Sequence, residues 1–522
     1  MKKQHINRTV LNNKKLLNIF LLCLTTLCLN GQPSIVWEKS LGGTGMDRGF
    51  SIQQLSDGNY IAVGVTSSSD GDVTTNHGDY DAWILKLNST GGIIWEKSLG
   101  GTFADNARHV QETSDGGYIV VGTFGSLVSG NHGGDDYWVI KLDNSGTILW
   151  DKKLGGSSWE RGQYIQETSD GGYIVSGTSE STDGDVTGNH GDKDYWVVKL
   201  NSVGNIVWEQ SLGGSNAEML GSCQETNDGG YIVAGSSFSL DGDITTHYGE
   251  NDIWLVKLNS QGGIVWEKTL GGTGWETTAI VEVMSDGGYT VVGASSSNNV
   301  DLTHNNGFSD FWTVRLDSIG TITWQVSLGS TGEDYPQSIQ ETSDGGCIIT
   351  GAVGAINGDV IGNGTGGGYC WLIKLTSTGT LDWQKSLGGT SSEMGAYVQE
   401  INNGDYILIG SSSSTDGDVT TNNGNYDYWV VKLSSVLGLS EVDESVSIDL
   451  FPNPALDLVT LKKDVKLTNA HYVVYNTMGQ AILSGDLTEE YTKIDTRDLL
   501  SGLYHVEIKT LSTTQTIPFV KQ

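Results

Sequence analysis

A single sequence unit recurs seven times between residues 32 and 435, and no unrelated segment separates the copies. Each copy contains, in order, patterns close to W-E-K-S-L-G-G-T, I-Q-E-T-S-D-G-G-Y-I-V-x-G and D-Y-W-V-V-K-L-N-S-x-G. Its first tryptophan recurs at Trp37, Trp95, Trp150, Trp208, Trp266, Trp324 and Trp383, in steps of 58, 55, 58, 58, 58 and 59 residues. A period this regular predicts repeated supersecondary units that pack on their neighbours.

Each unit divides into four short segments typical of β-strands. In the second unit these are residues 109–113, 118–123, 137–142 and 147–154, and Gly-containing turns separate the first pair and the last pair. The 73 glycines of the chain suit such turns and disfavour long helices. Seven antiparallel four-stranded units predict an all-β fold, a seven-bladed β-propeller over residues 32–435.

The two ends of the repeat region support a closed ring. The region opens with the fourth strand of a unit, around Trp37, and closes with the third strand of another, around Trp429. The last blade would then combine both ends of the region, which leaves no free sheet edge. A linear solenoid is the alternative, and it would need distinct polar caps.

The repeat also resembles a known family. The stretch Asp194–Gly214, followed by D-G-G-Y-I-V-A-G, resembles the bacterial β-propeller repeats often called SBBP repeats. The resemblance covers nearly all of the repeat region and implies the propeller fold. It does not imply an activity, because propellers carry many unrelated functions.

The first 31 residues predict a secretory signal peptide. Five basic residues precede an apolar run over residues 16–29, and the run is short for a membrane anchor, the alternative interpretation. No convincing lipidation motif precedes its cysteines, and no other segment predicts a membrane-spanning helix. Removal of the five basic residues changes the net charge from −33 to −38. A chain this acidic is not expected to bind nucleic acid or anionic membranes through charge.

After a polar linker, residues 436–446, the segment 447–522 predicts a small β-sandwich. It contains F-P-N-P, V-Y-N-x-x-G-Q and L-x-x-G-L-Y-x-V, which resemble the type A C-terminal sorting domain of the type IX secretion system in Bacteroidetes. The motif residues are Pro452, Asn453, Pro454, Gly479, Gly502 and Tyr504. The resemblance implies the type IX machinery as a partner, export across the outer membrane, and a secreted or surface-bound product.

Candidate site residues lie in the long connections, which we expect on one face of the ring. The connection before each innermost strand carries one acid, and two of these connections also carry a tryptophan. The residues are Asp47, Asp105, Glu160, Glu218, Glu276, Asp334, Glu393, Trp159 and Trp275. The acids are expected around the channel mouth, where they bind a cation or polar ligand, or else accept backbone N–H groups or pair with the recurrent strand lysines. The tryptophans suggest stacking on sugar rings.

A second set of acids suggests calcium. Asp-Gly-Asp recurs in the other long connections, and alternate oxygen ligands around a glycine suit Ca²⁺. These acids are Asp70, Asp72, Asp183, Asp185, Asp241, Asp243, Asp416 and Asp418. The alternative is a plain turn, since Asp-Gly favours turns and no downstream Glu completes a calcium loop. No other cofactor is indicated.

Three cysteines remain in the mature chain, Cys223, Cys347 and Cys370, and we expect three buried free thiols. Near-identical blades favour a non-catalytic protein that binds an extracellular ligand, for example a polysaccharide, or that serves in surface adhesion. The alternative is a glycoside hydrolase that uses two of the ring acids, although the sequence singles out no pair. A quinoprotein-like dehydrogenase is disfavoured, since no adjacent cysteine pair is present.

Overall fold

The computed structural model describes residues 32–522 except 126–129, 303, 363–367, 436–448, 463–469, 477–479, 488 and 510–513. The predicted signal peptide and linker therefore lie outside the described residues. Throughout the described part, the regular secondary structure is β-strand. No helix there is long and apolar enough to cross a membrane.

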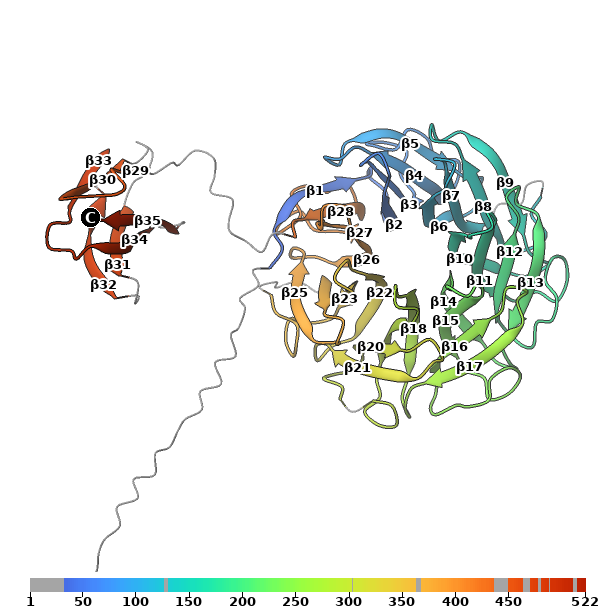
Figure 1. Ribbon diagram of the computed structural model, residues 1–522. Helices are drawn as coiled ribbons and strands as arrows, with labels where there is room; N and C mark the ends of the chain where they lie inside the picture. The colour runs from blue at the N-terminus through green and yellow to red at the C-terminus, as the bar shows by residue number, and fades with distance from the viewer. Residues whose placement is uncertain are drawn as a thin grey trace, which may run out of the picture. The chain divides into compact units, whose positions relative to one another are not determined.

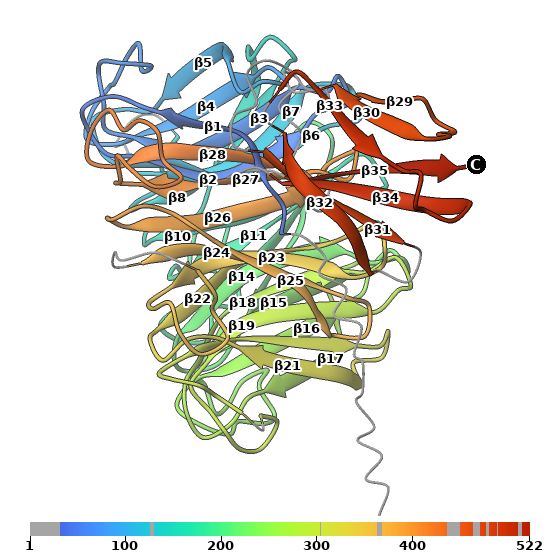
Figure 2. The same ribbon diagram turned by 90° about the vertical axis from the view of Figure 1, so that its left-hand side faces the viewer.

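Seven four-stranded antiparallel sheets follow one another around a ring between Ile35 and Leu433 (Figure 1). This arrangement is the predicted β-propeller, and Figure 2 views it edge-on. We call the sheets blades: blade 1 is β2–β5, blade 2 is β6–β9, blade 3 is β10–β13, blade 4 is β14–β17, blade 5 is β18–β21, blade 6 is β22–β25, and blade 7 is β26–β28 with β1.

The strands of the blades have closely matched bounds. The innermost strands are β2 (Asp47–Gln54), β6 (Asp105–Glu112), β10 (Glu160–Glu167), β14 (Glu218–Glu225), β18 (Glu276–Val283), β22 (Asp334–Glu341) and β26 (Glu393–Glu400). The second strands are β3 (Tyr60–Thr66), β7 (Tyr118–Phe124), β11 (Tyr173–Ser179), β15 (Tyr231–Ser237), β19 (Tyr289–Ser295), β23 (Cys347–Val353) and β27 (Tyr406–Ser412). The third strands are β4 (Asp81–Leu87), β8 (Asp136–Leu142), β12 (Asp194–Leu200), β16 (Asp252–Leu258), β20 (Asp310–Leu316), β24 (Tyr369–Leu375) and β28 (Asp427–Leu433). The outermost strands are β5 (Ile93–Leu99), β9 (Ile148–Leu154), β13 (Ile206–Leu212), β17 (Ile264–Leu270), β21 (Ile322–Leu328), β25 (Leu381–Leu387) and β1 (Ile35–Leu41).

The innermost strands are longer than the sequence predicted. In blade 2 the strand begins at Asp105 rather than at residue 109. The register between β6 and β7 shifts between Ala107 and His109, which marks a β-bulge at Arg108. A bulge breaks the period-2 alternation of side chains, so only the second half of the strand was visible as alternation.

Ring closure is by strand pairing. β1 pairs with β28 in antiparallel register, with Ser40 opposite Trp429, so the N-terminal strand completes blade 7. This pairing rules out the linear alternative, because blade 7 then contacts blade 1. Tyr428 in β28 donates its hydroxyl to the carbonyl of Trp83 in β4 at 3.0 Å, which joins the two blades.

The core lies between adjacent blades, and the third strands contribute to both sides of it. Trp83 and Leu85 belong to the core that blade 1 shares with blade 7, whereas Ile84 belongs to the core shared with blade 2. The buried Trp83 donates its Nε1–H to Glu96 of β5 at 2.8 Å. Burial of the ring with a satisfied indole N–H explains why Trp and Glu recur together in the unit.

The three cysteines are free and buried, as predicted. Cys347 lies opposite Leu375 and Cys370 opposite Ala352, so the two thiols occupy opposite ends of the β23–β24 pair. Burial raises the pKa of Cys347 and of Cys370 to about 12, so both are protonated and unreactive at neutral pH.

The C-terminal strands form a separate β-sandwich. One sheet contains β29 (Asp449–Phe451), β30 (Leu458–Lys462) and β33 (Tyr491–Asp495). The other contains β32 (Ala481–Leu487), β31 (Ala470–Asn476), β34 (Gly502–Lys509) and β35 (Thr514–Lys521). Val459 and Leu461 of the first sheet pack with Val474, Val506 and Phe519 of the second.

Candidate functional site

The seven acids expected at the channel mouth lie inside the blades. Each is the first residue of an innermost strand, and none exposes more than 1% of its surface. Glu218 is typical: its carboxylate accepts the Gly214 N–H at 3.0 Å and the Ser237 hydroxyl at 2.7 Å. Burial raises the pKa of Glu218 above its ordinary value. The geometry supports the structural interpretation, in which each acid holds the turn before its own strand, which is Gly-Gly in six blades and Gly-Ser in blade 6.

The turn leaves no room for a side chain. A Cβ on Gly213 would lie 2.2 Å from Oε2 of Glu218 and 2.7 Å from Oδ1 of Asp194. The Leu-Gly-Gly motif of the repeat therefore follows from the close approach of two buried carboxylates to the backbone.

The strand lysines do not pair with these acids, which corrects one part of the structural interpretation. Lys199 instead lies 3.0 Å from Asp170, in the tight turn between β10 and β11. The six other blades repeat this pair, with Arg315 in place of lysine in blade 5. The acid begins the first strand of its blade, whereas the lysine lies near the end of the third strand. Because these two strands run in the same direction, the acid and the lysine lie at opposite ends of each blade.

The Asp-Gly-Asp loops bind the backbone of the neighbouring connection. Asp183 accepts the Ser157 N–H at 2.7 Å, and Asp185 accepts the Gly155 N–H at 3.3 Å. Gly184 between them has a φ of 68°, and a Cβ there would lie 2.3 Å from the Gly155 carbonyl oxygen. Among the described residues, no three His, Cys, Asp or Glu side chains are placed to hold a metal ion. Calcium at these loops stays a prediction.

Trp159 and Trp275, the two tryptophans of the connections, lie outside the blade packing, and each exposes 52% of its surface. The Trp275 ring packs edge-on against Phe238 at 5.7 Å, and Trp159 lies directly over the backbone of Gly134. Both rings are therefore supported from one side and open to solvent on the other.

The sorting-motif residues surround the edge of the C-terminal sandwich. Asn453 accepts the Val520 N–H at 2.9 Å and donates to the Pro518 carbonyl at 3.1 Å, so the segment that includes Pro452 and Pro454 is held against β35. Gly502 opens β34, and Tyr504 donates its hydroxyl to the Leu500 carbonyl at 2.9 Å. Gly479 lies outside the described residues.

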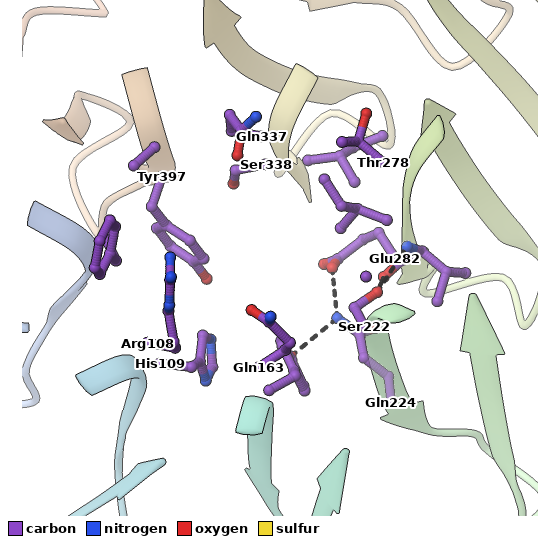
Figure 3. Close-up of a pocket in the computed structure, with 17 residues that line it drawn as sticks. Arg108, His109, Gln163, Ser222, Gln224, Thr278, Glu282, Gln337, Ser338 and Tyr397 are labelled. Carbon is purple, nitrogen blue, oxygen red and sulfur yellow. Dashed lines mark hydrogen bonds between the residues drawn. The ribbon is translucent and has the colours of Figure 1, made fainter. Parts of the chain in front are cut away.

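The central channel holds a cavity that the sequence did not predict. Its volume is about 280 Å³, and its walls come from the innermost strands of all seven blades (Figure 3). The bulged residue of each strand lines it, together with the residue that follows in most blades. The bulged residues are Phe50, Arg108, Gln163, Gly221, Thr278, Gln337 and Ala396. A bulge turns two consecutive side chains toward one face, and bulges commonly re-aim side chains in this way at functional sites.

A ring of amide side chains continues the channel. The seventh residue of each innermost strand is Gln in six blades, and its Oε1 accepts a backbone N–H from the next blade at 2.6–2.8 Å. These residues are Gln53, Gln111, Gln166, Gln224, Gln340 and Gln399. With Glu282 they line a hollow of about 300 Å³ that adjoins the cavity. Because the bonds run from blade to blade, the ring ties the inner edges of the propeller together.

Glu282 is the one acid in this ring. Its carboxylate accepts the Gln224 amide at 2.7 Å and the Glu341 N–H at 3.3 Å. Burial is the largest influence and raises its pKa from 4.5 to about 7. Blade 5 is distinct in a second way, since Thr278 beside the cavity has a φ of 52°, which is strained for a β-branched residue.

Arg108 and His109 lie on the side of the cavity opposite Glu282 in Figure 3. His109 is buried, stacks on Tyr164 at 4.2 Å and donates its Nδ1–H to the Ile165 carbonyl at 2.9 Å. Burial lowers the pKa of His109 to about 4, so the ring is neutral at neutral pH. The channel therefore combines one cation, one titrating acid and several neutral hydrogen-bonding groups.

Sequence reasoning missed these channel residues because it concentrated on the long connections. A signal was available: when the seven units are aligned, Glu282 stands alone in a column of Gln, and Arg108 stands alone in a column without other charges. What the alignment does not show is which columns face the channel.

Residues 449–522 match the family described as the secretion system C-terminal sorting domain. The protein carries a type IX secretion sorting domain. The three motifs at the end of the sequence had indicated this family. Proteins with this domain are secreted to the cell surface or the extracellular space, and this protein is one of them.

Other similarities concern the repeat region and the fold. The chain is 24% identical over 408 residues to the regulatory protein FlaEY of Caulobacter vibrioides, a match that covers 68% of this chain and 41% of FlaEY. Among solved structures, PorZ, a surface component of the type IX secretion system of Porphyromonas gingivalis, is 10% identical, with a TM-score of 0.29, and covers 89% of this chain and 68% of its own. The GH93 α-L-arabinofuranosidase of Fusarium graminearum is 11% identical, with a TM-score of 0.39, and covers 62% of this chain and 91% of its own. At these identities the likeness concerns the fold alone.

Proposed function

We propose that this protein is a secreted binding protein that holds part of an extracellular polysaccharide in the channel of its propeller. The observation that carries the proposal is the lining of the channel cavity. Neutral hydrogen-bonding side chains, among them Gln163, Ser222 and Gln337, line the cavity together with the aromatic rings of Phe50 and Tyr397. Sugars present hydroxyl groups and apolar ring faces together, and a cavity with both kinds of partner suits them.

The two exposed tryptophans support the same proposal. Trp159 belongs to the connection into blade 3 and Trp275 to the connection into blade 5, and each presents one open ring face. Rings fixed in this way lose little conformational entropy on binding. A chain of sugars could therefore stack on the tryptophans on the face of the long connections.

A glycoside hydrolase is less well supported. Hydrolysis of a glycosidic bond usually needs two carboxyl groups about 5 to 9.5 Å apart. Among the described residues that line the cavity, Glu282 is the one acid. The seven acids that begin the innermost strands are buried and hydrogen-bonded to the turns before their own strands. The cavity thus offers one carboxyl group without a second one to act with it, which favours binding over cleavage.

The test is a glycan array probed with the purified mature chain, with and without calcium, followed by a reducing-end assay on every glycan retained. We expect retention without new reducing ends, and weaker retention for Trp159→Ala, Trp275→Ala and Gln163→Ala. Ile319→Ala is the matched control, since this exposed side chain lies in a tight turn of blade 5. Release of reducing ends that Glu282→Gln abolishes would establish an enzyme instead. If no glycan on the array is retained, the proposal is refuted. Retention that depends on calcium would support calcium binding at the Asp-Gly-Asp loops.

A further inference from the structure

A hollow at the inner ends of blades 1 to 3 leads into the channel. Its volume is about 440 Å³, and its lining includes Phe103, Asp135 and Arg161. Arg108 and Gln163 line both this hollow and the channel cavity, so the two spaces meet at these side chains. A ligand group that passes from the hollow into the channel cavity would therefore pass the guanidinium of Arg108.

Arg108 has no ionic partner within the part of the chain that the structure describes. Its guanidinium lies over the ring of Phe50, 4.2 Å from the ring centroid. Two further cations act on its charge: Arg161, which lies 3.9 Å from Asp135, and Arg48, which lies over the ring of Tyr426 at 4.9 Å. Three arginines of adjacent innermost strands are therefore grouped in a chain whose net charge is −33.

The electrostatics of Arg108 are unfavourable without an anion. Burial and the charges of Arg161 and Arg48 lower the pKa of Arg108 to about 10, so it stays charged at neutral pH. A charge in such a place is ordinarily paired. An anion bound beside Arg108 would offset both the burial and the repulsion.

Stacking on Phe50 does not account for the whole guanidinium. A cation–π contact uses the flat face of the group, whereas its five N–H donors lie in the plane and point away from the ring. No hydrogen bond joins these donors to another described residue. They match the geometry of a carboxylate or a sulfate, which accept two parallel N–H bonds from one arginine.

We propose that the junction of the hollow and the channel binds an oxyanion, a carboxylate or a sulfate, carried by a sugar. This inference rests on the proposed function and narrows its ligand to an acidic glycan. Arg108 holds the oxyanion, and Arg161 adds positive charge at the rim. Asp79 and Asp135 also line the hollow, and Asp135 opposes the anion while it faces Arg161.

The test uses small probes, so that it does not depend on the identity of the full glycan. Calorimetric titration of the mature chain at low salt would compare D-galacturonate, sodium sulfate and neutral D-galactose. We expect galacturonate to bind at least about tenfold more tightly than galactose, and Arg108→Gln to remove this difference. Arg497→Gln, an exposed arginine of the C-terminal sandwich, is the control and should leave binding unchanged.

Two further variants test whether nearby negative charge weakens the binding of galacturonate. Asp135→Asn removes the acid beside Arg161, and Glu282→Gln removes the acid across the channel. Both should tighten galacturonate binding, whereas a site selected by shape alone would not respond. If sulfate binds as well, and Arg108→Gln removes that binding, then the site recognises the oxyanion rather than the sugar.

Failure of the oxyanion site can be distinguished from failure of the proposed polysaccharide binding. If galactose and galacturonate bind equally and Arg108→Gln changes neither, the oxyanion site is wrong while the polysaccharide-binding function stands. If neither galacturonate nor sulfate binds, the oxyanion site is also wrong, and the glycan array decides the function separately. A loss of binding by Arg108→Gln counts only if its unfolding temperature stays within a few degrees of the wild type.

Discussion

Replacement of Glu282 by Gln would convert the mixed ring of the channel into a ring of seven amides. The Gln side chain keeps an oxygen to accept the Glu341 N–H, as the equivalent Gln does in the other blades. It removes an acid whose pKa burial raises from 4.5 to about 7. The substitution also removes the carboxylate that accepts a hydrogen bond from the Gln224 amide. The Gln224 amide then still has the Tyr164 hydroxyl as an acceptor, at 3.2 Å.

The sign of the effect follows from the direction of the pKa shift. Because the folded protein holds the Glu282 proton more tightly than the unfolded chain, this group stabilises the fold below pH 4.5. That contribution is lost as the pH rises toward and through 7. Between pH 5 and pH 8 the loss amounts to about 2–3 kcal/mol, an upper value because the carboxyl faces the channel. Glu282→Gln does not titrate, so its free energy of unfolding should rise relative to the wild type by this amount over the same interval.

The measurement is thermal unfolding of both proteins at pH 5 and pH 8. For a body of this size, 1 kcal/mol corresponds to about 1–2 °C. At pH 5 the variant should match the wild type or unfold slightly lower, since the lost hydrogen bond from Gln224 costs about 1 kcal/mol. At pH 8 the difference between variant and wild type should have risen by about 3 °C. Taking differences at each pH cancels the titration of all other groups.

Gln340→Glu is the matched control, because it places a second acid at the same position of blade 6. Its effect should have the opposite sign, with little change at pH 5 and a lower unfolding temperature at pH 8. The reasoning is refuted if Glu282→Gln changes the unfolding temperature equally at both pH values, or lowers it more at pH 8.

Three further predictions concern the scaffold. Gly177→Ala should lower the free energy of unfolding by about 3 kcal/mol or more, since a Cβ there would lie 1.9 Å from the Arg161 carbonyl; denaturant titration measures it, and an effect below 1 kcal/mol would contradict the packing. Glu218→Ala should cost about 2–4 kcal/mol, because the buried Gly214 N–H loses its acceptor; a loss of glycan binding without loss of stability would instead return this acid to the site. A thiol reagent should label none of the three mature-chain cysteines in the native protein and all three in denaturant, and rapid native labelling would contradict their burial.

The sequence by itself determined the all-β ring, its closure and the C-terminal sorting domain. Strand periodicity and glycine turns are local features, and seven copies of them leave little choice of architecture. The sequence also contains the faces of β4: Trp83 and Leu85 lie in one core and Ile84 in the next, because an unbroken strand alternates strictly. Trp159 and Trp275 stand outside the repeated tryptophan positions of the unit, and both are exposed.

Only the tertiary structure decided which side chains face the channel. A bulge at Arg108 reverses the alternation in the middle of the innermost strand, so Asp105 turns into the blade while Arg108 and His109 both line the cavity. Whether a bulge forms depends on the pairing of β6 with β7, and the meeting of Arg108 and Glu282 across one cavity depends on seven strands that converge on one axis. Such contacts join residues far apart in the chain, so they cannot be predicted from the periodic pattern within one unit.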